Sequence, residues 1–195
     1  MQALTVYCSS STHLDPEFHE PAAIVGAELA RRGISLVYGG GKIGLMGEVA
    51  QAIQKGGGRI VGVITQYLLD REQGKEDCDE LIIVDSMRER KRLMAEKGDG
   101  FLILPGGLGT YEEFFEILTG RVVREHTKPI GIVNVNGYFN PFLDLVAHGI
   151  EHRFIKPAVR ELFIIDPDPR KVVDQVCSHQ GVVIDDDRFL PMGSG

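Results

Sequence analysis

Apolar and polar residues alternate along this chain in a way that predicts strands and helices in turn. Short apolar runs rich in Val, Ile and Leu indicate buried strands. We expect them at residues 2–7, 34–37, 59–64, 81–84, 101–104, 129–133 and 163–165. Between these runs, apolar residues recur at the spacing of amphipathic helices. We expect helices at residues 15–33, 44–55, 86–97, 141–152 and 168–177, with a further helix that begins at residue 110.

Strands that alternate with helices form a parallel sheet with helices packed on both faces. We therefore expect an α/β fold, a Rossmann-like doubly wound parallel sheet, with a single domain at residues 1–180 and a loose C-terminal tail at residues 181–195. Pro21 conflicts with a continuous first helix and predicts a late start or a kink. The polar segment 66–80 is interpreted as a mobile loop near a site.

The stretch from residue 101 to residue 113 joins a buried strand, a glycine-rich loop and a helix start. Pro-Gly-Gly-Leu-Gly at 105–109 ends the strand and forms the loop. Thr110 is predicted to cap the helix, and with Glu113 it matches a capping box. Free backbone N–H groups at such a junction favour an anion, most often a phosphate.

Two further loops are expected at the same sheet edge, where ligands of such folds bind. They contribute Cys8, Ser9, Gly39, Gly40, Gly41 and Gly44 as secondary residues of a nucleotide site. The glycines match dinucleotide-binding spacing, but the next strand ends at Thr65 without the acidic residue that binds a ribose. Tight turns or part of another nucleotide site are favoured instead, and no Gly-Lys-Ser/Thr follows that would indicate a P-loop.

Arg90 lies on the inward stripe of the helix predicted at 86–97, between Met87 and Met94. A buried, unpaired charge is costly, so this cation needs a partner. It is either a surface arginine with a buried stem, or a guanidinium that reaches over the carboxyl edge of the sheet toward the glycine loop. Glu113 either completes a cap and does nothing more, or is a carboxylate that chemistry uses beside a bound anion.

Composition narrows the class of partner. The 195 residues include 28 acidic and 21 basic side chains, with a formal net charge of −7, so we expect no nucleic-acid partner. Three cysteines without CxxC spacing fit a reducing compartment. We find neither a membrane span nor a signal peptide, and we expect a cytoplasmic protein without a membrane partner.

His148-x-x-Glu151-His152 formally matches a zinc-protease pattern. The two histidines would share a helix face, but Gly149 weakens that helix and no third ligand is evident. We interpret the segment as a partly exposed helix end and expect no metal.

Met-x-x-Arg-Lys-x-x-Met at 87–94 and Pro-Gly-Gly-Leu-Gly-Thr-Tyr-Glu-Glu at 105–113 together closely resemble the LOG family. These are cytokinin riboside 5′-monophosphate phosphoribohydrolases, often labelled lysine decarboxylases, and the resemblance covers nearly the whole chain. It implies a homodimer that cleaves the N-glycosidic bond of AMP or of N6-prenylated AMP, giving free base and ribose 5-phosphate. We expect no cofactor, because decarboxylation needs pyridoxal phosphate on a Schiff-base lysine and no lysine is singled out.

The resemblance also assigns roles to residues. Arg90 and Glu113 fall on the catalytic positions. Substrate contacts fall on Glu72, Arg90, Lys91, Met94, Gly106, Gly107, Leu108, Gly109, Thr110, Tyr111, Glu112 and Thr119. A carboxylate suits this reaction because it stabilises an oxocarbenium-like state and activates water. A guanidinium beside it can hold the carboxylate ionised.

A binding protein is the alternative, since related Rossmann-like proteins carry molybdenum cofactor without turnover. A carrier needs the glycine loops but no water-activating carboxylate. The pair of Arg90 and Glu113 therefore separates the two hypotheses.

Overall fold

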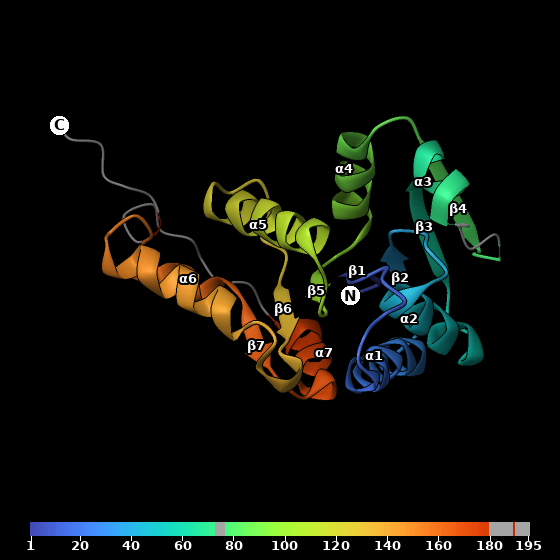
Figure 1. Cartoon of the computed structure of the whole chain (residues 1–195), viewed down its shortest axis with the longest axis horizontal. Coiled ribbons are helices and arrows are strands. Elements are labelled where there is room, and N and C mark those ends of the chain that lie inside the picture. Colours follow the sequence, from blue (N-terminus) through green and yellow to red (C-terminus); the bar gives the residue numbers. More distant parts are fainter. Residues whose placement is uncertain (73–76, 180–188, 190–195) are drawn as a thin grey trace.

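The computed structural model describes residues 1–72, 77–179 and 189, and its strands form one parallel sheet. Figure 1 shows the strands, which follow the spatial order β4-β3-β2-β1-β5-β6-β7. They are β1 (Ala3–Tyr7), β2 (Ser35–Tyr38), β3 (Ile60–Thr65), β4 (Glu80–Val84), β5 (Phe101–Ile103), β6 (Ile130–Val133) and β7 (Ile164–Asp166). Every predicted strand is present, so the expected Rossmann-like α/β fold is confirmed.

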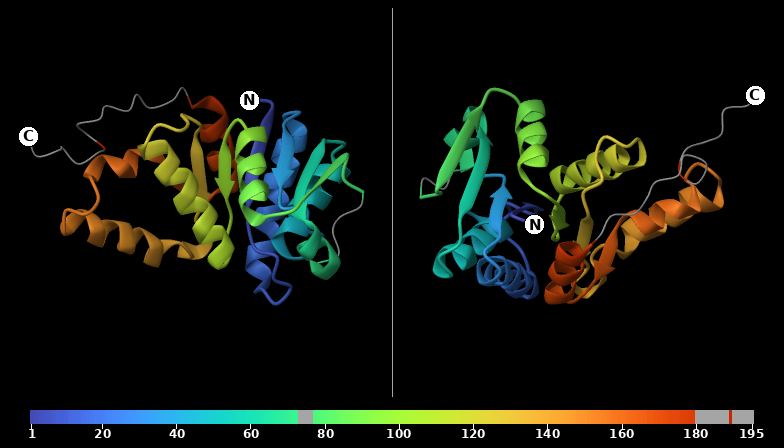
Figure 2. Two further views of the ribbon diagram at one scale, coloured as in Figure 1. Left: turned by 90° about the horizontal axis from the view of Figure 1, so that it is seen from above. Right: turned by 180° about the vertical axis from the view of Figure 1, so that it is seen from behind.

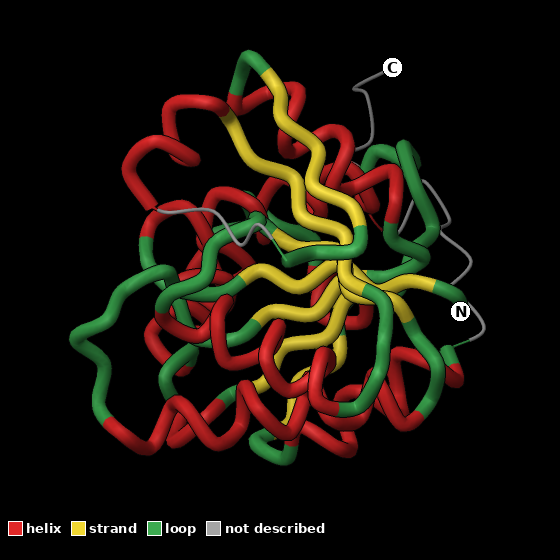
Figure 3. Tube along the Cα trace, turned by 90° about the vertical axis from the view of Figure 1, so that its right-hand side faces the viewer, coloured by secondary structure: helices red, strands yellow, loops and turns green. Residues whose placement is uncertain are grey.

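Helices lie on both faces of the sheet, as Figures 2 and 3 show. The α-helices are α1 (His19–Arg31), α2 (Gly44–Lys55), α3 (Gln66–Glu72), α4 (Met87–Lys97), α5 (Leu108–Val122), α6 (Asn140–Glu151) and α7 (Pro169–Ser178). Short 3₁₀ turns occupy Pro16–Phe18, Val135–Gly137 and Pro157–Leu162. Among the described residues, none of these helices combines the length and hydropathy that crossing a bilayer requires.

Two apolar clusters hold the layers together. One joins the sheet to α1, α2 and α7 through buried side chains such as Leu29, Ile53 and Val172. The other joins the opposite face to α4, α5 and the 3₁₀ turn Pro157–Leu162, with Phe114 and Met94 in it. Because both faces are covered, the strands are apolar on both sides, which is why their sequences are nearly continuous hydrophobic runs.

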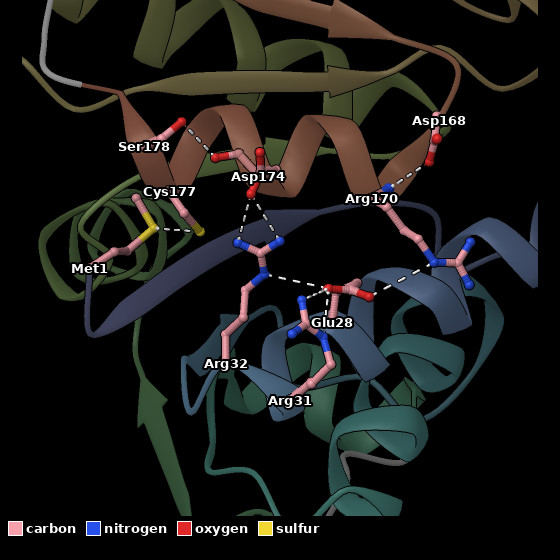
Figure 4. Close-up of polar contacts among 9 residues, drawn as sticks. All are labelled: Met1, Glu28, Arg31, Arg32, Asp168, Arg170, Asp174, Cys177 and Ser178. Carbon is pink, nitrogen blue, oxygen red and sulfur yellow. Dashed lines mark hydrogen bonds and ion pairs between the residues drawn. The ribbon is translucent and has the colours of Figure 1, made fainter.

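The C-terminal helix is also tied to the first helix by charge (Figure 4). The Glu28 carboxylate of α1 accepts hydrogen bonds from Arg31 at 2.7 Å and from Arg32 at 3.4 Å. The Arg170 guanidinium of α7 lies 3.8 Å from the same carboxylate, and Arg32 reaches Asp174 of α7 at 3.3 Å. Ends of the chain that are far apart in sequence are thereby packed together.

Local signals placed most helix boundaries correctly. Ser86 caps α4 by accepting a hydrogen bond from the Glu89 backbone N–H at 3.2 Å, as predicted. The first helix starts late, at His19, so Pro21 lies in its first turn, where a missing N–H is harmless.

The prediction of a loop over 66–80 is wrong in part. Residues 66–72 form α3, whose first turn is held by the Leu68 N–H donating to the Thr65 hydroxyl at 3.2 Å. A bond of 2.8 Å from the Gln66 amide to Asp70 adds an i,i+4 contact. Residues 73–76 lie outside the described residues. So does the expected tail at 181–195, apart from Phe189, whose side chain is buried.

The strand order fixes where a ligand can bind. From β1 the chain proceeds outward to β4 and then crosses back to β5, on the other side of β1. The loops that follow β1 and β5 therefore lead away in opposite directions at this switch point and leave a crevice at the carboxyl ends of the strands. Where the two loops leave the sheet, a hydrogen bond of 3.1 Å from the Ser9 N–H to the Pro105 carbonyl joins them.

Candidate active site

A pocket of about 470 Å³ lies at this crevice, and we call it the switch-point pocket. Five segments contribute to its wall: the loop after β1, the start of α2, α3, the start of α4, and the loop that opens α5. The lining residues are Cys8, Ser9, Ser10, Ser11, Met46, Leu68, Met87, Arg90, Gly107, Leu108, Gly109, Thr110 and Glu113. The two predicted catalytic residues and most of the predicted glycine loop thus share one cavity.

The α5 helix presents free N–H groups to this pocket. It begins at Leu108 with Gly107 at the N-cap, and no side chain in the described part of the chain caps it. Its first backbone bond runs from the Tyr111 N–H to the Gly107 carbonyl at 3.1 Å, which leaves the N–H groups from Gly107 to Thr110 without a helical acceptor. Such a helix start is an anion-binding site, because N–H dipoles converge on it.

The capping box predicted from Thr110 and Glu113 is wrong. The observed N-cap, Gly107, lies three residues before the predicted one, so Thr110 is inside the first turn with a buried side chain. That side chain packs against Gly106, where any Cβ would overlap it. Because no side chain occupies the cap position, the N–H groups stay available for a ligand.

Arg90 is buried, which excludes the interpretation of a snorkelling surface arginine. Its side chain is 5% exposed and lines the switch-point pocket. The guanidinium donates through Nε to the Val63 carbonyl at 2.9 Å and through Nη2 to the Gly39 carbonyl at 3.0 Å. The ends of β2 and β3 therefore hold it in a fixed orientation at the carboxyl edge of the sheet.

Glu113 is 9% exposed and faces the same pocket. Burial raises the pKa of its carboxyl group to about 7, and the charge of Arg90 acts against this shift. No hydrogen bond or ion pair of 4.0 Å or shorter joins Arg90 to Glu113 in the part of the chain that the structure describes. Arg90 lowers the pKa of Glu113, as expected, but burial raises it by more, so Arg90 does not hold the carboxylate ionised at neutral pH. A carboxyl group poised near neutrality can exchange a proton with water.

Lys91 and Glu112 lie beside the pocket rather than in it. The Lys91 ammonium of α4 forms ion pairs of 2.6 Å with Glu112 and 2.9 Å with Glu116 of α5. This bridge sets the spacing between the helices that carry Arg90 and Glu113.

The other predicted contacts are dispersed. Met94 is 1% exposed and belongs to the core, whereas Thr119 lines a separate pocket with Phe115 and Phe154. The hydroxyl of Tyr111 pairs with that of Tyr138 at 2.8 Å. Glu72 ends α3, and its side chain lies outside what the structure describes.

The glycine loop at 39–44 supports the pocket from behind. Gly39, Gly40 and Gly41 are buried and do not line it. A Cβ on Gly39 would collide with the Arg90 guanidinium, and one on Gly44 would lie 2.6 Å from the Ser11 carbonyl oxygen. Close packing of backbone against these partners explains the glycines without a dinucleotide.

Sequence reasoning missed several lining residues. Met46 and Leu68 enter the pocket from α2 and α3. Ser10 and Ser11 also line it, as part of the polar loop 8–11 that the sequence places at this edge of the sheet. Tyr138 was not assigned a role, although its hydroxyl contacts the loop at the Gly106 carbonyl. Only the polar character of 8–11 was a usable signal, because the other contacts depend on how distant segments pack.

The chain is similar in sequence to known proteins over most of its length. A family model described as "Possible lysine decarboxylase" matches residues 46–176. The chain is 41% identical over 172 residues to a probable cytokinin riboside 5′-monophosphate phosphoribohydrolase of Oryza sativa subsp. japonica, LOGL2, with 88% of this chain and 70% of the relative covered. It is 40% identical over 173 residues to the cytokinin riboside 5′-monophosphate phosphoribohydrolase LOG7 of Arabidopsis thaliana, covering 89% and 80%.

Solved structures share the fold at low identity. The molybdenum cofactor binding protein of Rippkaea orientalis superposes with a TM-score of 0.69 at 18% identity, covering 91% of this chain and 96% of that one. At that identity the likeness concerns the fold alone. The level of identity to the curated relatives, over most of both chains, settles the family: this chain belongs to the LOG family of phosphoribohydrolases.

Proposed function

We propose that the chain hydrolyses the N-glycosidic bond of adenine nucleoside 5′-monophosphates, including N6-prenylated ones, to free base and ribose 5-phosphate. One observation carries this proposal: the buried Glu113 carboxyl shares a single pocket with the uncapped start of α5. A phosphate at the N–H groups of residues 107–110 places a ribose within the cavity, beside that carboxyl group.

In the proposed reaction, the negative charge of ionised Glu113 stabilises the positive charge that develops on the ribosyl ring as the bond from C1′ to the base breaks. Glu113 then accepts a proton from the attacking water, whose hydroxyl bonds to C1′, and the departing base takes up a proton, so that the products are ribose 5-phosphate and neutral base. Arg90 favours the ionised form of Glu113 and orients the sugar phosphate from its fixed position on Val63 and Gly39. The relatives named as phosphoribohydrolases support the same reaction class.

Lysine decarboxylation is not proposed, although the matching family model carries that description. The Lys91 amine is engaged by two carboxylates, Glu112 and Glu116. It thus serves to join α4 to α5.

The test is incubation of the purified chain with AMP, followed by chromatography for free adenine. We expect adenine release by the wild type, and loss of release in Glu113→Gln with AMP binding retained in calorimetry. Tight AMP binding by the wild type without any release would favour the carrier alternative and overturn the proposal. The ratio of kcat/KM for isopentenyladenosine monophosphate to that for AMP then identifies the preferred base.

We also propose a cytoplasmic homodimer with no nucleic-acid partner. Exposed Phe115 and Phe154 border the pocket that contains Thr119, and such apolar surface is typical of an interface. The odd number of cysteines, three, without CxxC spacing supports a reducing compartment. Sedimentation analysis of the purified chain tests the dimer.

A further inference from the structure

The last turn of α6 carries a second group of reactive side chains. His148, Glu151 and His152 each offer one ligand atom, and these three atoms lie within 4.8 Å of one another. The two imidazole rings are 4.3 Å apart between centroids. All three side chains are exposed, and none belongs to the switch-point pocket.

The backbone beneath this group is well ordered by hydrogen bonds, despite Gly149. The His152 N–H donates to the His148 carbonyl at 3.0 Å, and the Phe154 and Ile155 N–H groups both donate to the Gly149 carbonyl. A Cβ on Gly149 would approach Ile155 to 2.6 Å. The absence of a side chain at Gly149 thus leaves room for Ile155 where the chain folds back on the helix, and Gly149 does not end the helix before Glu151.

The surroundings favour a cation. Within the described residues, His148, Glu151 and His152 have no side-chain hydrogen bond or ion pair that would compete for the ligand atoms. The negative end of the helix dipole also lies at this C-terminus and adds negative potential there. Figure 1 shows α6 along the outer edge of the molecule, so an ion in solvent can reach this end.

The donor set selects the kind of ion. Two imidazoles with one carboxylate suit Zn²⁺ and similar transition metals, whereas Mg²⁺ and Ca²⁺ prefer oxygen ligands. The sequence raised two objections to zinc: a helix weakened by Gly149 and the lack of a third ligand. The helix continues through Gly149 to Glu151, and the Glu151 carboxylate supplies the third ligand, so neither objection holds.

We propose that the C-terminal turn of α6 binds one divalent transition-metal ion of the zinc type. His148 and His152 supply nitrogen ligands, Glu151 supplies an oxygen ligand, and water completes the shell. The ion joins adjacent turns of the helix end and stabilises the folded chain. It takes no part in the proposed hydrolysis, since its ligands do not line the switch-point pocket.

The test is calorimetric titration of zinc sulfate into the untagged, full-length chain, after EDTA treatment and dialysis, with a non-thiol reductant present. We expect one ion per chain and a Tm that rises by a few degrees in Zn²⁺ but not in Mg²⁺. The double variant His148→Ala/His152→Ala should bind Zn²⁺ at least about tenfold more weakly, because both imidazole ligands are gone. Glu151→Gln should weaken binding less.

His13→Ala is the matched control, since it removes an exposed histidine from a loop elsewhere and should bind Zn²⁺ like the wild type. Equal Zn²⁺ affinity in the double variant and the wild type would overturn the proposal, as would a wild type that neither binds Zn²⁺ nor gains stability from it. Unchanged binding in Glu151→Gln would overturn the carboxylate ligand. Tm values without metal show whether the variants fold.

Discussion

The Tyr138 hydroxyl donates a hydrogen bond of 2.6 Å to the Gly106 carbonyl oxygen, and so ties the glycine loop to the segment between β6 and α6. Burial raises the pKa of Tyr138 to about 12, which keeps the hydroxyl protonated and able to donate. Because a peptide group is planar, fixing this carbonyl also fixes the Gly107 N–H, which points the opposite way. Gly107 lines the switch-point pocket, so Tyr138 orients one of the N–H groups that we propose bind the phosphate.

We therefore expect Tyr138→Phe to raise KM for AMP several-fold with little change in kcat. The lost bond is worth about 1 kcal/mol, and the phenyl ring retains the packing of Tyr138 against Phe18. Steady-state adenine release measures both constants. Tyr111→Phe is the control, since it removes the neighbouring hydroxyl but leaves the bond to Gly106, and it should change KM less. An unchanged KM in Tyr138→Phe would show that the bond does not orient the loop.

Glu113 makes the stability of the free protein depend on pH. Its pKa is about 7 in the folded chain, above the ordinary value of 4.5. Between these two values the unfolded chain releases a proton that the folded chain keeps, so stability falls as pH rises and levels off above about 7. Glu113→Gln removes this penalty, which reaches at most about 3 kcal/mol. We expect the variant to have a higher Tm than the wild type at pH 8, and a much smaller difference at pH 4.5.

Thermal unfolding of the two proteins across this pH range checks the prediction. Glu112→Gln is the control, because its exposed carboxylate is paired with Lys91 and is not buried. A Tm difference between Glu113→Gln and wild type that does not vary with pH would mean that the carboxyl group titrates normally.

The same group predicts the pH dependence of the proposed reaction. If ionised Glu113 accepts the proton from water, kcat/KM for AMP should fall about tenfold per pH unit well below pH 7, because only the ionised fraction reacts. Initial rates of adenine release between pH 5 and pH 9 give the profile. A flat profile through pH 7 would exclude Glu113 as the base.

The fold was predictable because its signals are local and periodic. Apolar runs such as 101–104, set between glycines and amphipathic segments, leave few alternatives to a parallel doubly wound sheet. Ser86 was recognised as a cap from its spacing to Glu89. Where such local signals were ambiguous the prediction failed: Thr110 is a better capping residue than Gly107, yet the helix begins at Leu108.

The site was predictable only in outline. Sequence placed Arg90 and the glycine loop at one sheet edge because strand ends meet there. It did not reveal that Arg90 bonds to Val63 and Gly39, or that Tyr138 bonds to Gly106, since these contacts join segments 27 to 51 positions apart. Nor did it reveal the raised pKa of Glu113, which depends on burial that only the packed structure defines.

Arg90→Lys tests whether the fork of the guanidinium is needed. An ammonium group cannot bond to the Val63 and Gly39 carbonyls in the same geometry, so one buried acceptor loses its partner. We expect a loss of about 1–3 kcal/mol in the free energy of unfolding by urea, together with reduced adenine release. Arg92→Lys is the matched control, because Arg92 is exposed and pairs only along the helix with Glu96 among the described residues. Equal stability of the two variants would contradict the role of these carbonyls.

Substitution by alanine should have different effects on stability at two glycines of the same loop, Gly106 and Gly109. A methyl group on Gly106 would overlap the Thr110 side chain, and we expect Gly106→Ala to lower the free energy of unfolding by about 1–3 kcal/mol. Nothing in the described part of the chain lies within 4 Å of a Cβ on Gly109, so Gly109→Ala should match or exceed wild-type stability, since alanine favours the helix. Gly109 nevertheless lines the switch-point pocket, and its methyl group would occupy the space of a bound phosphate. Urea unfolding and AMP titration of both variants separate these effects: Gly109→Ala should weaken AMP binding without any loss of stability, and undiminished AMP binding there would place the phosphate away from this turn.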